Sequence, residues 1–268
     1  MKTIAIIPIG GVGSRMNSDI PKQYIEVNNK PIFIYTVEKF QANPNINNIV
    51  ISCKKEFFDD VKNECEKYHI NKLYKIVCSG KTQLETIFNS VNAIKKDFSM
   101  NDKIVIHVGN RPNITDRLIT DCVNLYDKYG SLTTTVPCIE GMVNINNNSI
   151  LSRKDLIRIQ TPQVYSFSDI EKYCNNSDEY CNKGSTICDL FLLEGRKIKF
   201  VNGEMLNFKI TYEEDLELFK LIVNSKNSWN FKTKSKKKSP RPSKWICKRT
   251  QRLKTKPKLE NYKILFFL

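Results

Sequence analysis

The sequence predicts an α/β fold built on a doubly wound, mostly parallel sheet with helices on both of its faces. Two observations predict it: short apolar runs alternate along the chain with segments of helical spacing, and the first apolar run leads directly into glycines. Alternating strands and helices form parallel sheets because each helix carries the chain back to the edge where the next strand begins. With 268 residues, of which 40% are hydrophobic, the chain is long enough to bury a large core.

Each expected strand is a short run rich in apolar and β-branched residues, which is typical of strands buried on both faces. The first run, Thr3–Pro8, is continuous (TIAIIP) and is followed by Gly10 and Gly11. The further expected strands are 49–53, 74–77, 103–107, 132–136 and 198–201. Between them, apolar residues recur at the three- and four-residue spacing of one helix face. The expected helices are 32–40, 56–67, 84–94, 114–129, 168–174 and 213–223.

One stretch, residues 138–160, interrupts this alternation. It contains two β-like pieces, 141–145 and 150–153, separated by a run of asparagines, which favour turns. We therefore expect a hairpin arm that projects from the sheet. Residues 1–225, with this arm included, are expected to form one domain.

The net charge of +15 is concentrated at one end of the chain. Residues 226–268 hold fifteen Lys or Arg and a single acid, Glu260, whereas residues 1–225 carry a net charge of only +1. Because this basic segment lacks hydrophobic periodicity over most of its length, we predict a disordered tail. Its charge, with Trp229 and Trp245, leaves open a polyanion-binding protein on an inert scaffold. Charge alone is a weak signal, so we expect nucleic acid to bind only non-specifically through the tail.

Composition also excludes several classes of protein. No run approaches the ~20 apolar residues of a membrane-spanning helix, and no signal peptide is evident, so we expect a cytoplasmic protein without a membrane segment. The nine cysteines include no C-x-x-C pair, and His69 and His107 are the only imidazoles, so structural zinc is not expected. Cys174, Cys181 and Cys188 recur every seven residues, which we interpret as one partly buried helix face.

The loop after the first strand carries the strongest chemical signal. Gly10, Gly11 and Gly13 lie within four residues, which lets the backbone turn tightly and point its N–H groups at phosphate oxygens. Open α/β sheets bind ligands at this end of a parallel strand. The spacing fits neither a Walker A loop nor the G-x-G-x-x-G fingerprint, and an ordinary glycine turn stays open as an alternative. Arg15 and Lys22 follow, and two cations beside a phosphate cradle suit a reaction that develops charge on phosphorus.

Further motifs follow the glycine loop in a fixed order. After GGVGSRM and PKQY come SG with Thr86, HVGNRP, Arg153 with QTPQ, and finally NFKIT. Together these motifs, which span residues 1 to about 225, resemble the polyol-phosphate cytidylyltransferase family, whose members act on 2-C-methyl-D-erythritol 4-phosphate or ribitol 5-phosphate. Several motifs in one order are more specific than the loop alone. The resemblance implies a Rossmann-like nucleotidyltransferase fold.

The resemblance also implies a reaction and a set of site residues. CTP would lie across the glycine-rich loop, and a phosphate oxygen of the polyol phosphate would attack its α-phosphorus and expel pyrophosphate. The cations implied to be catalytic, by clamping the triphosphate, are Arg15, Lys22 and Lys209. The residues implied to bind the nucleotide are Pro8, Ile9, Gly10, Gly11, Gly13, Ser14, Gly80, Thr86, Gly109 and Arg111. Arg153 and Thr161 would hold the phosphate of the second substrate, although a plain turn role for Thr161 stays open.

The cofactor implied by the resemblance is Mg²⁺, held mainly by the phosphates of CTP, and the implied partner is a second copy of the chain. Residues 138–160 would form the homodimer and bring Arg153 to the partner's site. The chain has Val108 and Leu206 where the family usually has carboxylates, so no protein metal ligand is assigned. Because the triphosphate supplies most ligands in such sites, metal binding can survive this change. The acids that could replace the missing carboxylates are Glu140, Asp189 and Glu204.

We expect the chain to transfer CMP from CTP to ribitol 5-phosphate or a similar polyol phosphate, for cell-surface polysaccharide synthesis. The segment Val108-Gly109-Asn110 and the ending GEMLNFKIT favour this substrate, since both differ from the erythritol enzymes. Two alternatives stay open: activity on 2-C-methyl-D-erythritol 4-phosphate, and a catalytically weakened relative that only binds nucleotide. His107 is not expected to act as a general base, because a phosphate nucleophile needs no deprotonation near pH 7.

Overall fold

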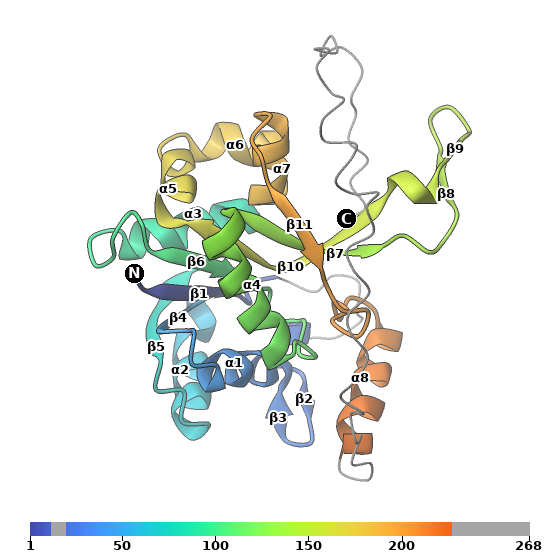
Figure 1. Ribbon diagram of the computed structural model, residues 1–268. Coiled ribbons are helices and arrows are strands. Elements are labelled where there is room, and N and C mark those ends of the chain that lie inside the picture. The colour runs from blue at the N-terminus through green and yellow to red at the C-terminus, as the bar shows by residue number, and fades with distance from the viewer. Residues whose placement is uncertain (12–19, 227–268) are drawn as a thin grey trace. The chain divides into compact units, whose positions relative to one another are not determined.

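A seven-stranded sheet lies at the centre of the computed structural model, which describes residues 1–11 and 20–226. The strand order is β11-β7-β10-β6-β1-β4-β5 (Figure 1). The strands are β1 (Thr3–Pro8), β4 (Asn48–Cys53), β5 (Leu73–Cys78), β6 (Lys103–Ile106), β7 (Leu132–Pro137), β10 (Ile157–Ser166) and β11 (Lys199–Asn202). All neighbours are parallel except β10, which is antiparallel to β6 and β7. The predicted mostly parallel α/β fold is confirmed.

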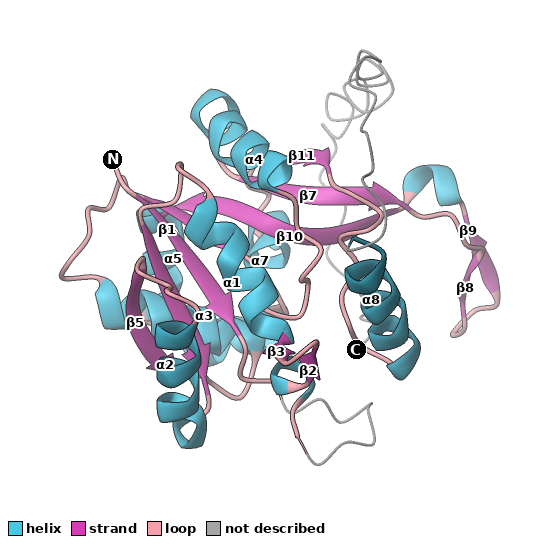
Figure 2. Cartoon of the chain, turned by 90° about the horizontal axis from the view of Figure 1, so that it is seen from below, coloured by secondary structure: helices cyan, strands magenta, loops and turns pink. Residues whose placement is uncertain are grey.

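Helices cover both faces of this sheet (Figure 2). On one face, α1 (Ile32–Ala42), α2 (Phe58–Lys67) and α4 (Asp116–Tyr129) pack with Ala5 and Ile7 of β1. On the other, α3 (Gln83–Ile94), α5 (Phe167–Cys174), α6 (Ser177–Lys183) and α7 (Ile187–Leu193) surround Ile4 and Ile6. Because successive side chains of a strand point to opposite faces, the continuous apolar run of β1 is buried in both cores.

Strand β10 was not predicted, although it lies in the middle of the sheet between β6 and β7. Its pairing with β7 shifts register between Ile159 and Gln163, and Pro162 lies inside that irregular stretch. Proline cannot donate to a strand ladder, so its presence argues against a central strand. The shift in register tolerates it, which is why the sequence pattern was misleading here. Residues 157–160, predicted as part of the arm, belong to β10.

The predicted hairpin arm is formed by β8 (Met142–Asn144) and β9 (Ser149–Leu151), which pair antiparallel beyond the end of β7. Asparagine side chains make its turn: Asn144 accepts from the N–H of Asn146 at 3.0 Å, and Asn147 from that of Ser149 at 3.1 Å. A short 3-10 turn, η3 (Arg153–Asp155), leads from the hairpin into β10. Figure 1 shows the hairpin extending away from the sheet.

A small third cluster joins the end of the domain to its beginning. Leu216 and Phe219 of α8 (Glu213–Lys226) pack with Val27, Ile32 and Ile210. The chain enters this cluster through the 3-10 turn η1 (Lys22–Tyr24) and the strand pair β2 (Glu26–Val27) and β3 (Lys30–Pro31). Ile210 adjoins Lys209, so the packing brings the segment that carries Lys209 to the segment that follows Lys22.

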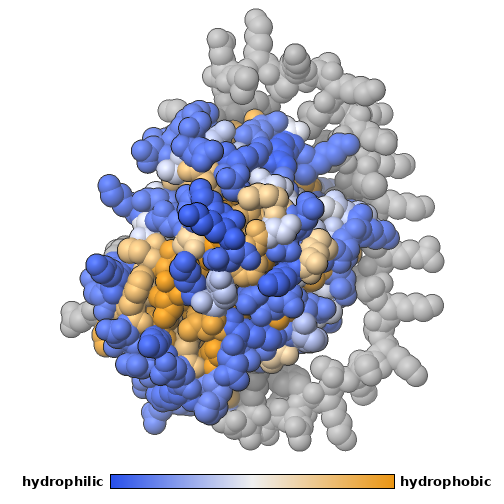
Figure 3. Space-filling model, turned by 90° about the vertical axis from the view of Figure 1, so that its left-hand side faces the viewer, coloured by the Kyte–Doolittle hydropathy of each residue, from blue (hydrophilic) through white to orange (hydrophobic). Residues whose placement is uncertain are grey.

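The face of the molecule in Figure 3 is mostly hydrophilic. Figure 3 looks at the side where the edge strand β5 lies, and apolar patches appear there between hydrophilic side chains. Tyr74 of β5 is 42% exposed and packs edge-on against Phe98. No helix within residues 1–11 and 20–226 combines the length and apolarity needed to cross a bilayer. The predicted disordered tail lies outside the described residues.

The three regularly spaced cysteines do not form one helix face, as the sequence spacing had suggested. Cys174 ends α5, Cys181 lies in α6 and Cys188 lies in α7. Two short non-helical connections therefore separate the three cysteines. Cys174 and Cys188 are buried in the core, and all three thiols are free. The repeat of seven residues therefore reflects three short helices packed in sequence.

Candidate functional site

The carboxyl ends of β1, β5 and β6 meet at glycines. A Cβ atom on Gly10 would lie 2.3 Å from the Cβ of Ser79, and one on Gly109 would lie 2.2 Å from Cγ2 of Ile9. The N–H of Gly109 donates to the carbonyl of Pro8 at 3.0 Å. Any side chain at these glycines would push the loops apart, so the approach depends on bare backbone. This is the end of the sheet where ligands bind in open α/β folds.

Gln23 fixes the base of the glycine-rich loop. It is 3% exposed in η1, and its amide donates to the carbonyls of Ile9 and Gly11, the latter at 2.6 Å. Lys22 precedes it in the same turn, so this amide sets the position of the lysine backbone beside the loop. The remaining residues predicted for this loop, Gly13, Ser14 and Arg15, lie outside the described residues.

The loop between β5 and α3 is held by the hydroxyl of Thr86. This hydroxyl accepts from the N–H of Gly80 at 3.0 Å and donates to the carbonyl of Thr82 at 2.8 Å. Glu85 caps the same loop by accepting from the N–H of Lys81 at 2.7 Å. Thr86 is 5% exposed, so its contribution to a nucleotide site is to fix the backbone of Gly80.

His107 lies at the end of β6 and is completely buried. Its Nε2 lies 3.2 Å from the carbonyl of Arg111 and its Nδ1 lies 3.1 Å from Oγ1 of Thr161. Burial, and secondarily the nearby Arg111 charge, lower the pKa of His107 to about 3. A neutral ring with Nε2 donating and Nδ1 accepting satisfies both contacts, so His107 fastens the loop after β6 to β10.

Thr161 uses its hydroxyl within the sheet. Besides the contact with His107, it accepts from the N–H of Val108 at 3.4 Å, and the residue is 6% exposed. Arg153, predicted to act with it on the second substrate, lies on the arm in η3 and donates to the carbonyl of Ile139 at 2.9 Å. The structure therefore places these two residues on different parts of the fold.

Arg111 joins the loop after β6 to the segment that carries Lys209. Its Nη1 donates to the carbonyl of Asn207 at 2.6 Å, while its buried Nε has no partner among the described residues. Asn110 and Ile210 exchange two hydrogen bonds of 2.9 Å between the same two segments. Burial, with a smaller effect of Arg158, lowers the pKa of Arg111 to about 10. A desolvated guanidinium of this kind favours an anionic ligand.

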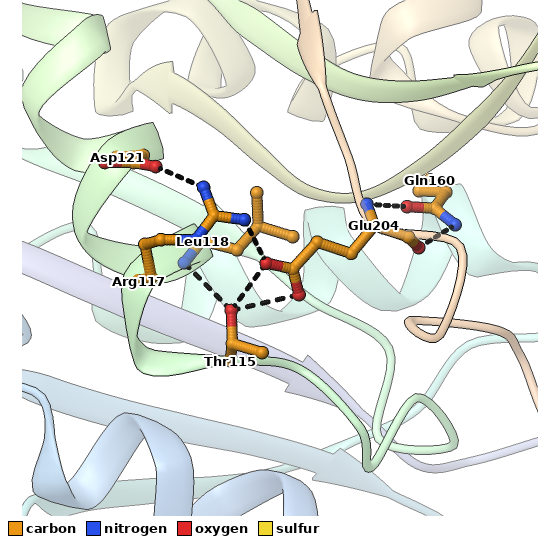
Figure 4. Close-up of polar contacts among 6 residues, drawn as sticks. All are labelled: Thr115, Arg117, Leu118, Asp121, Gln160 and Glu204. Atoms are coloured by element: carbon orange, nitrogen blue, oxygen red, sulfur yellow. Dashed lines mark hydrogen bonds and ion pairs between the residues drawn. The ribbon is translucent and has the colours of Figure 1, made fainter. Parts of the chain in front are cut away.

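Two of the three acids that could have replaced the missing carboxylates are engaged elsewhere, and Figure 4 shows the contacts of one of them, Glu204. Glu204 accepts from the hydroxyl of Thr115 at 2.9 Å and pairs with Arg117 at 2.5 Å. Asp189 closes the capping box of α7, and Glu140 is exposed on the arm.

Metal ligands are correspondingly scarce. Within the described parts of the chain, no group of three or more His, Cys, Asp or Glu side chains could hold a metal ion. Val108 is 7% exposed at the end of β6, and Leu206 is 63% exposed. The described residues therefore do not by themselves form a magnesium site.

Comparison with known proteins agrees with this geometry. The sequence profile of the family described as IspD, 2-C-methyl-D-erythritol 4-phosphate cytidylyltransferase, matches residues 3–225. A ribitol-5-phosphate cytidylyltransferase of Vibrio parahaemolyticus is 35% identical over 84% of this chain and 97% of its own. Another, of Lacticaseibacillus paracasei, is 30% identical over 83% of this chain and 98% of its own.

A solved structure shares the fold. The 2-C-methyl-D-erythritol 4-phosphate cytidylyltransferase of Francisella tularensis superposes with a TM-score of 0.69 at 26% identity, over 82% of this chain and 99% of that chain. The fold is thus that of a nucleotidyltransferase. The chain belongs to the IspD family of cytidylyltransferases, which are enzymes.

Two buried glutamines were missed as supporting residues of the site. Gln23 and Gln160 were both quoted in motifs, PKQY and QTPQ, but neither was given a role. Gln23 bonds the glycine-rich loop, and Gln160, at 6% exposure, bonds the segment before Lys209. Their presence in ordered motifs was the available signal, but only the fold reveals which carbonyls their amides reach.

Replacing Gly109 by alanine should destabilise the protein by about 1–3 kcal/mol, because the new methyl group must displace the branched side chain of Ile9. The matched control is Gly141→Ala, where no atom lies within 4 Å of the new Cβ and the change should be within about 0.5 kcal/mol. Urea unfolding measures both. Equal stability of Gly109→Ala and wild type would refute the close contact.

The depressed pKa of His107 predicts acid sensitivity. The folded ring stays neutral down to a pKa of about 3, whereas the unfolded ring takes up a proton below its ordinary value of 6.5. Stability is therefore fully present above pH 6.5 and is lost as the pH falls, by about 2 kcal/mol between pH 6.5 and 5. In His107→Gln this part of the loss should disappear, as measured by urea unfolding at both pH values. An identical loss in variant and wild type would mean that other groups cause it.

Proposed function

We propose that the chain transfers CMP from CTP to ribitol 5-phosphate or a similar polyol phosphate, giving a CDP-polyol and pyrophosphate. The observation that carries this proposal is the similarity to two ribitol-5-phosphate cytidylyltransferases over 97% and 98% of their own lengths. The CDP-polyol would be an activated donor for cell-surface polysaccharide synthesis, and the reaction would take place in the cytoplasm.

The nucleotide would lie against the backbone at the carboxyl ends of β1, β5 and β6. Gly10, Gly80 and Gly109 support this role, because the absence of a side chain lets a nucleotide lie close to the backbone. Gly11, which is exposed, and the neighbouring Pro8 and Ile9 would complete the nucleotide site. Arg111, desolvated and joined only to a backbone carbonyl in the described contacts, would stabilise the nearby anion.

The reaction is a displacement at the α-phosphorus of CTP. An oxygen of the polyol phosphate forms a new bond to that phosphorus, and the bond to the bridging oxygen breaks with its electron pair leaving on pyrophosphate. No covalent enzyme intermediate is needed, so the protein contributes position and positive charge. Lys22 and Lys209, brought to one side of the fold by the α8 cluster, would supply that charge together with Arg15.

Magnesium is proposed as a chelate of the triphosphate and not as an ion held by the protein. The scarcity of ligands around Val108 supports this, since described acids such as Glu204 are engaged elsewhere. Bound to CTP, the ion would neutralise part of the phosphate charge. The steps assigned here to Lys22, Lys209 and Arg111 do not depend on where the ion lies.

A homodimer is proposed through the arm. Its large apolar side chains are unusually exposed for a monomer, notably Ile145 at 76% and Ile150 at 84%. A second copy of the arm would bury them, because isologous contacts match each patch with itself. Arg153 on the same arm would then reach the phosphate of the second substrate in the partner's site.

Purified protein with CTP and Mg²⁺ should release pyrophosphate with ribitol 5-phosphate at least about tenfold more efficiently than with 2-C-methyl-D-erythritol 4-phosphate, a selectivity of about 1.4 kcal/mol. A coupled pyrophosphate assay measures kcat/KM for both. Lys209→Gln serves as the control, since loss of one transition-state cation should cost roughly 10²-fold or more in kcat. Release with the erythritol substrate alone would overturn the substrate assignment, and thermal stabilisation by CTP without release would favour the weakened relative.

The dimer proposal predicts that Ile150→Asp is monomeric, because an exposed patch that drives association does not tolerate a desolvated charge. The wild-type protein should sediment as a dimer at micromolar concentration. Leu193→Asp is the matched control, since Leu193 is 46% exposed at the end of α7, away from the arm, and should leave the dimer intact. A monomeric wild-type protein in analytical ultracentrifugation would contradict the proposal.

A further inference from the structure

The segment between β11 and α8 carries Lys209 but contains no helix or strand of its own over residues 203–212. Its position therefore depends on hydrogen bonds to neighbouring elements. At one end, the N–H of Gly203 donates to the carbonyl of Thr135 at 2.8 Å. At the other, Asn110 and Ile210 exchange two bonds of 2.9 Å. The middle of the segment is held from β10 and by Arg111 of the loop after β6.

Gln160 of β10 makes several of the bonds to this middle part, beside the bond from Arg111 to the carbonyl of Asn207. Its Nε2 donates to the carbonyl of Glu204 at 3.0 Å and its Oε1 accepts from the N–H of Glu204 at 3.3 Å (Figure 4). Its Nε2 also donates to the carbonyl of Asn207 at 3.2 Å. One buried amide thus binds the segment at three backbone atoms. A bond also runs from the segment to β10: Nδ2 of Asn207 donates to the carbonyl of Thr161 at 2.8 Å.

Gly203 leaves the space that Gln160 needs. A Cβ atom on Gly203 would lie 2.4 Å from Oε1 of Gln160 and 3.3 Å from the carbonyl oxygen of Thr135. The amide cannot retreat without losing its three bonds, since Gln160 is only 6% exposed. A glycine in GEMLNFKIT and a glutamine in QTPQ, 43 positions apart in the sequence, therefore form one packing unit.

We propose that Gln160 is a positioning residue that sets the place of Lys209 for transfer of CMP. The inference rests on the proposed function, in which Lys209 meets the α-phosphate. Gln160 lies seven positions C-terminal to Arg153 and does not itself touch substrate; it acts through the backbone of residues 204–207. The side-chain carboxylate of Glu204 is held by Thr115 and Arg117, while its backbone is held by the Gln160 amide. Glu204 is therefore fixed at both its side chain and its backbone.

The test compares Gln160→Met with Gln163→Met. Methionine keeps the shape of glutamine and removes its hydrogen bonds, and Gln163 is equally buried at 2% exposure but bonds only to the hydroxyl of Tyr165 in the described contacts. Gln160→Met should lower kcat roughly 10- to 100-fold with a change of less than about threefold in KM for CTP, since the lysine is misplaced mainly for the transition state. Gln163→Met should leave kcat within about twofold.

Gly203→Ala approaches the same contact from the other side. Its kcat should fall to a similar extent as that of Gln160→Met. The double variant should be no worse than either single one by more than about threefold, because both break one unit. A fully additive loss in the double variant would overturn the shared mechanism. Near-ultraviolet circular dichroism checks that each variant is folded.

Hydrogen exchange gives a readout that needs no turnover. Peptides covering residues 203–211 should exchange at least about tenfold faster in Gln160→Met than in wild type, and unchanged in Gln163→Met. Unchanged exchange in Gln160→Met, or equal losses of kcat in the two methionine variants, would overturn the positioning role. A wild-type protein that is silent with every polyol phosphate would overturn the proposed function instead, and exchange would still decide whether Gln160 holds the segment.

Discussion

Close approach of bare backbones at the carboxyl ends of β1, β5 and β6 is the constraint on which the site depends. A Cβ at Gly10, Gly80 or Gly109 would fall 2.2–2.4 Å from a neighbouring atom, far inside van der Waals contact. Gly10 and Gly109 thus let the three loops meet, and Gly80 leaves room for Glu85 in its own loop. A nucleotide at this edge would lie against backbone that carries no side chain. Gln23, Thr86 and His107 each form a hydrogen bond that fixes one of these loops. The loops are therefore preorganised by buried neutral groups.

Electrostatics in the described part of the site are one-sided. Burial lowers the pKa of Arg111, whose Nη1 is bonded to a carbonyl, and two acids considered for the site are committed elsewhere: Glu204 to Arg117 and Asp189 to a helix cap. Such a site gains most from a ligand that brings several negative charges, since burial of an uncompensated cation is costly. This agrees with a triphosphate better than with a neutral ligand.

The fold was largely predictable, since buried strands such as β1 and β4 are continuous apolar runs and helices such as α3 and α4 keep their spacing. The failures have local physical causes. Pro162 hid β10, because the register shift that accommodates a proline leaves no trace in composition. The short helices α6 and α7 are too brief to show periodicity, so their cysteines were interpreted as one face. Tertiary packing decided both cases.

The glycines and cations of the site were predictable, because those residue types in that order indicate phosphate binding. The buried residues that hold the loops in place were not predictable. A glutamine in a motif looks like any polar residue until the fold shows that Gln23 and Gln160 are buried with their amides aimed at carbonyls. Neutral amides suit this task. A lysine in their place could donate to the same carbonyls but would add a charge near the triphosphate, and a carboxylate could not donate to them. Glutamine donates without charge, so Lys22 and Lys209 can be positioned without a change in the local charge.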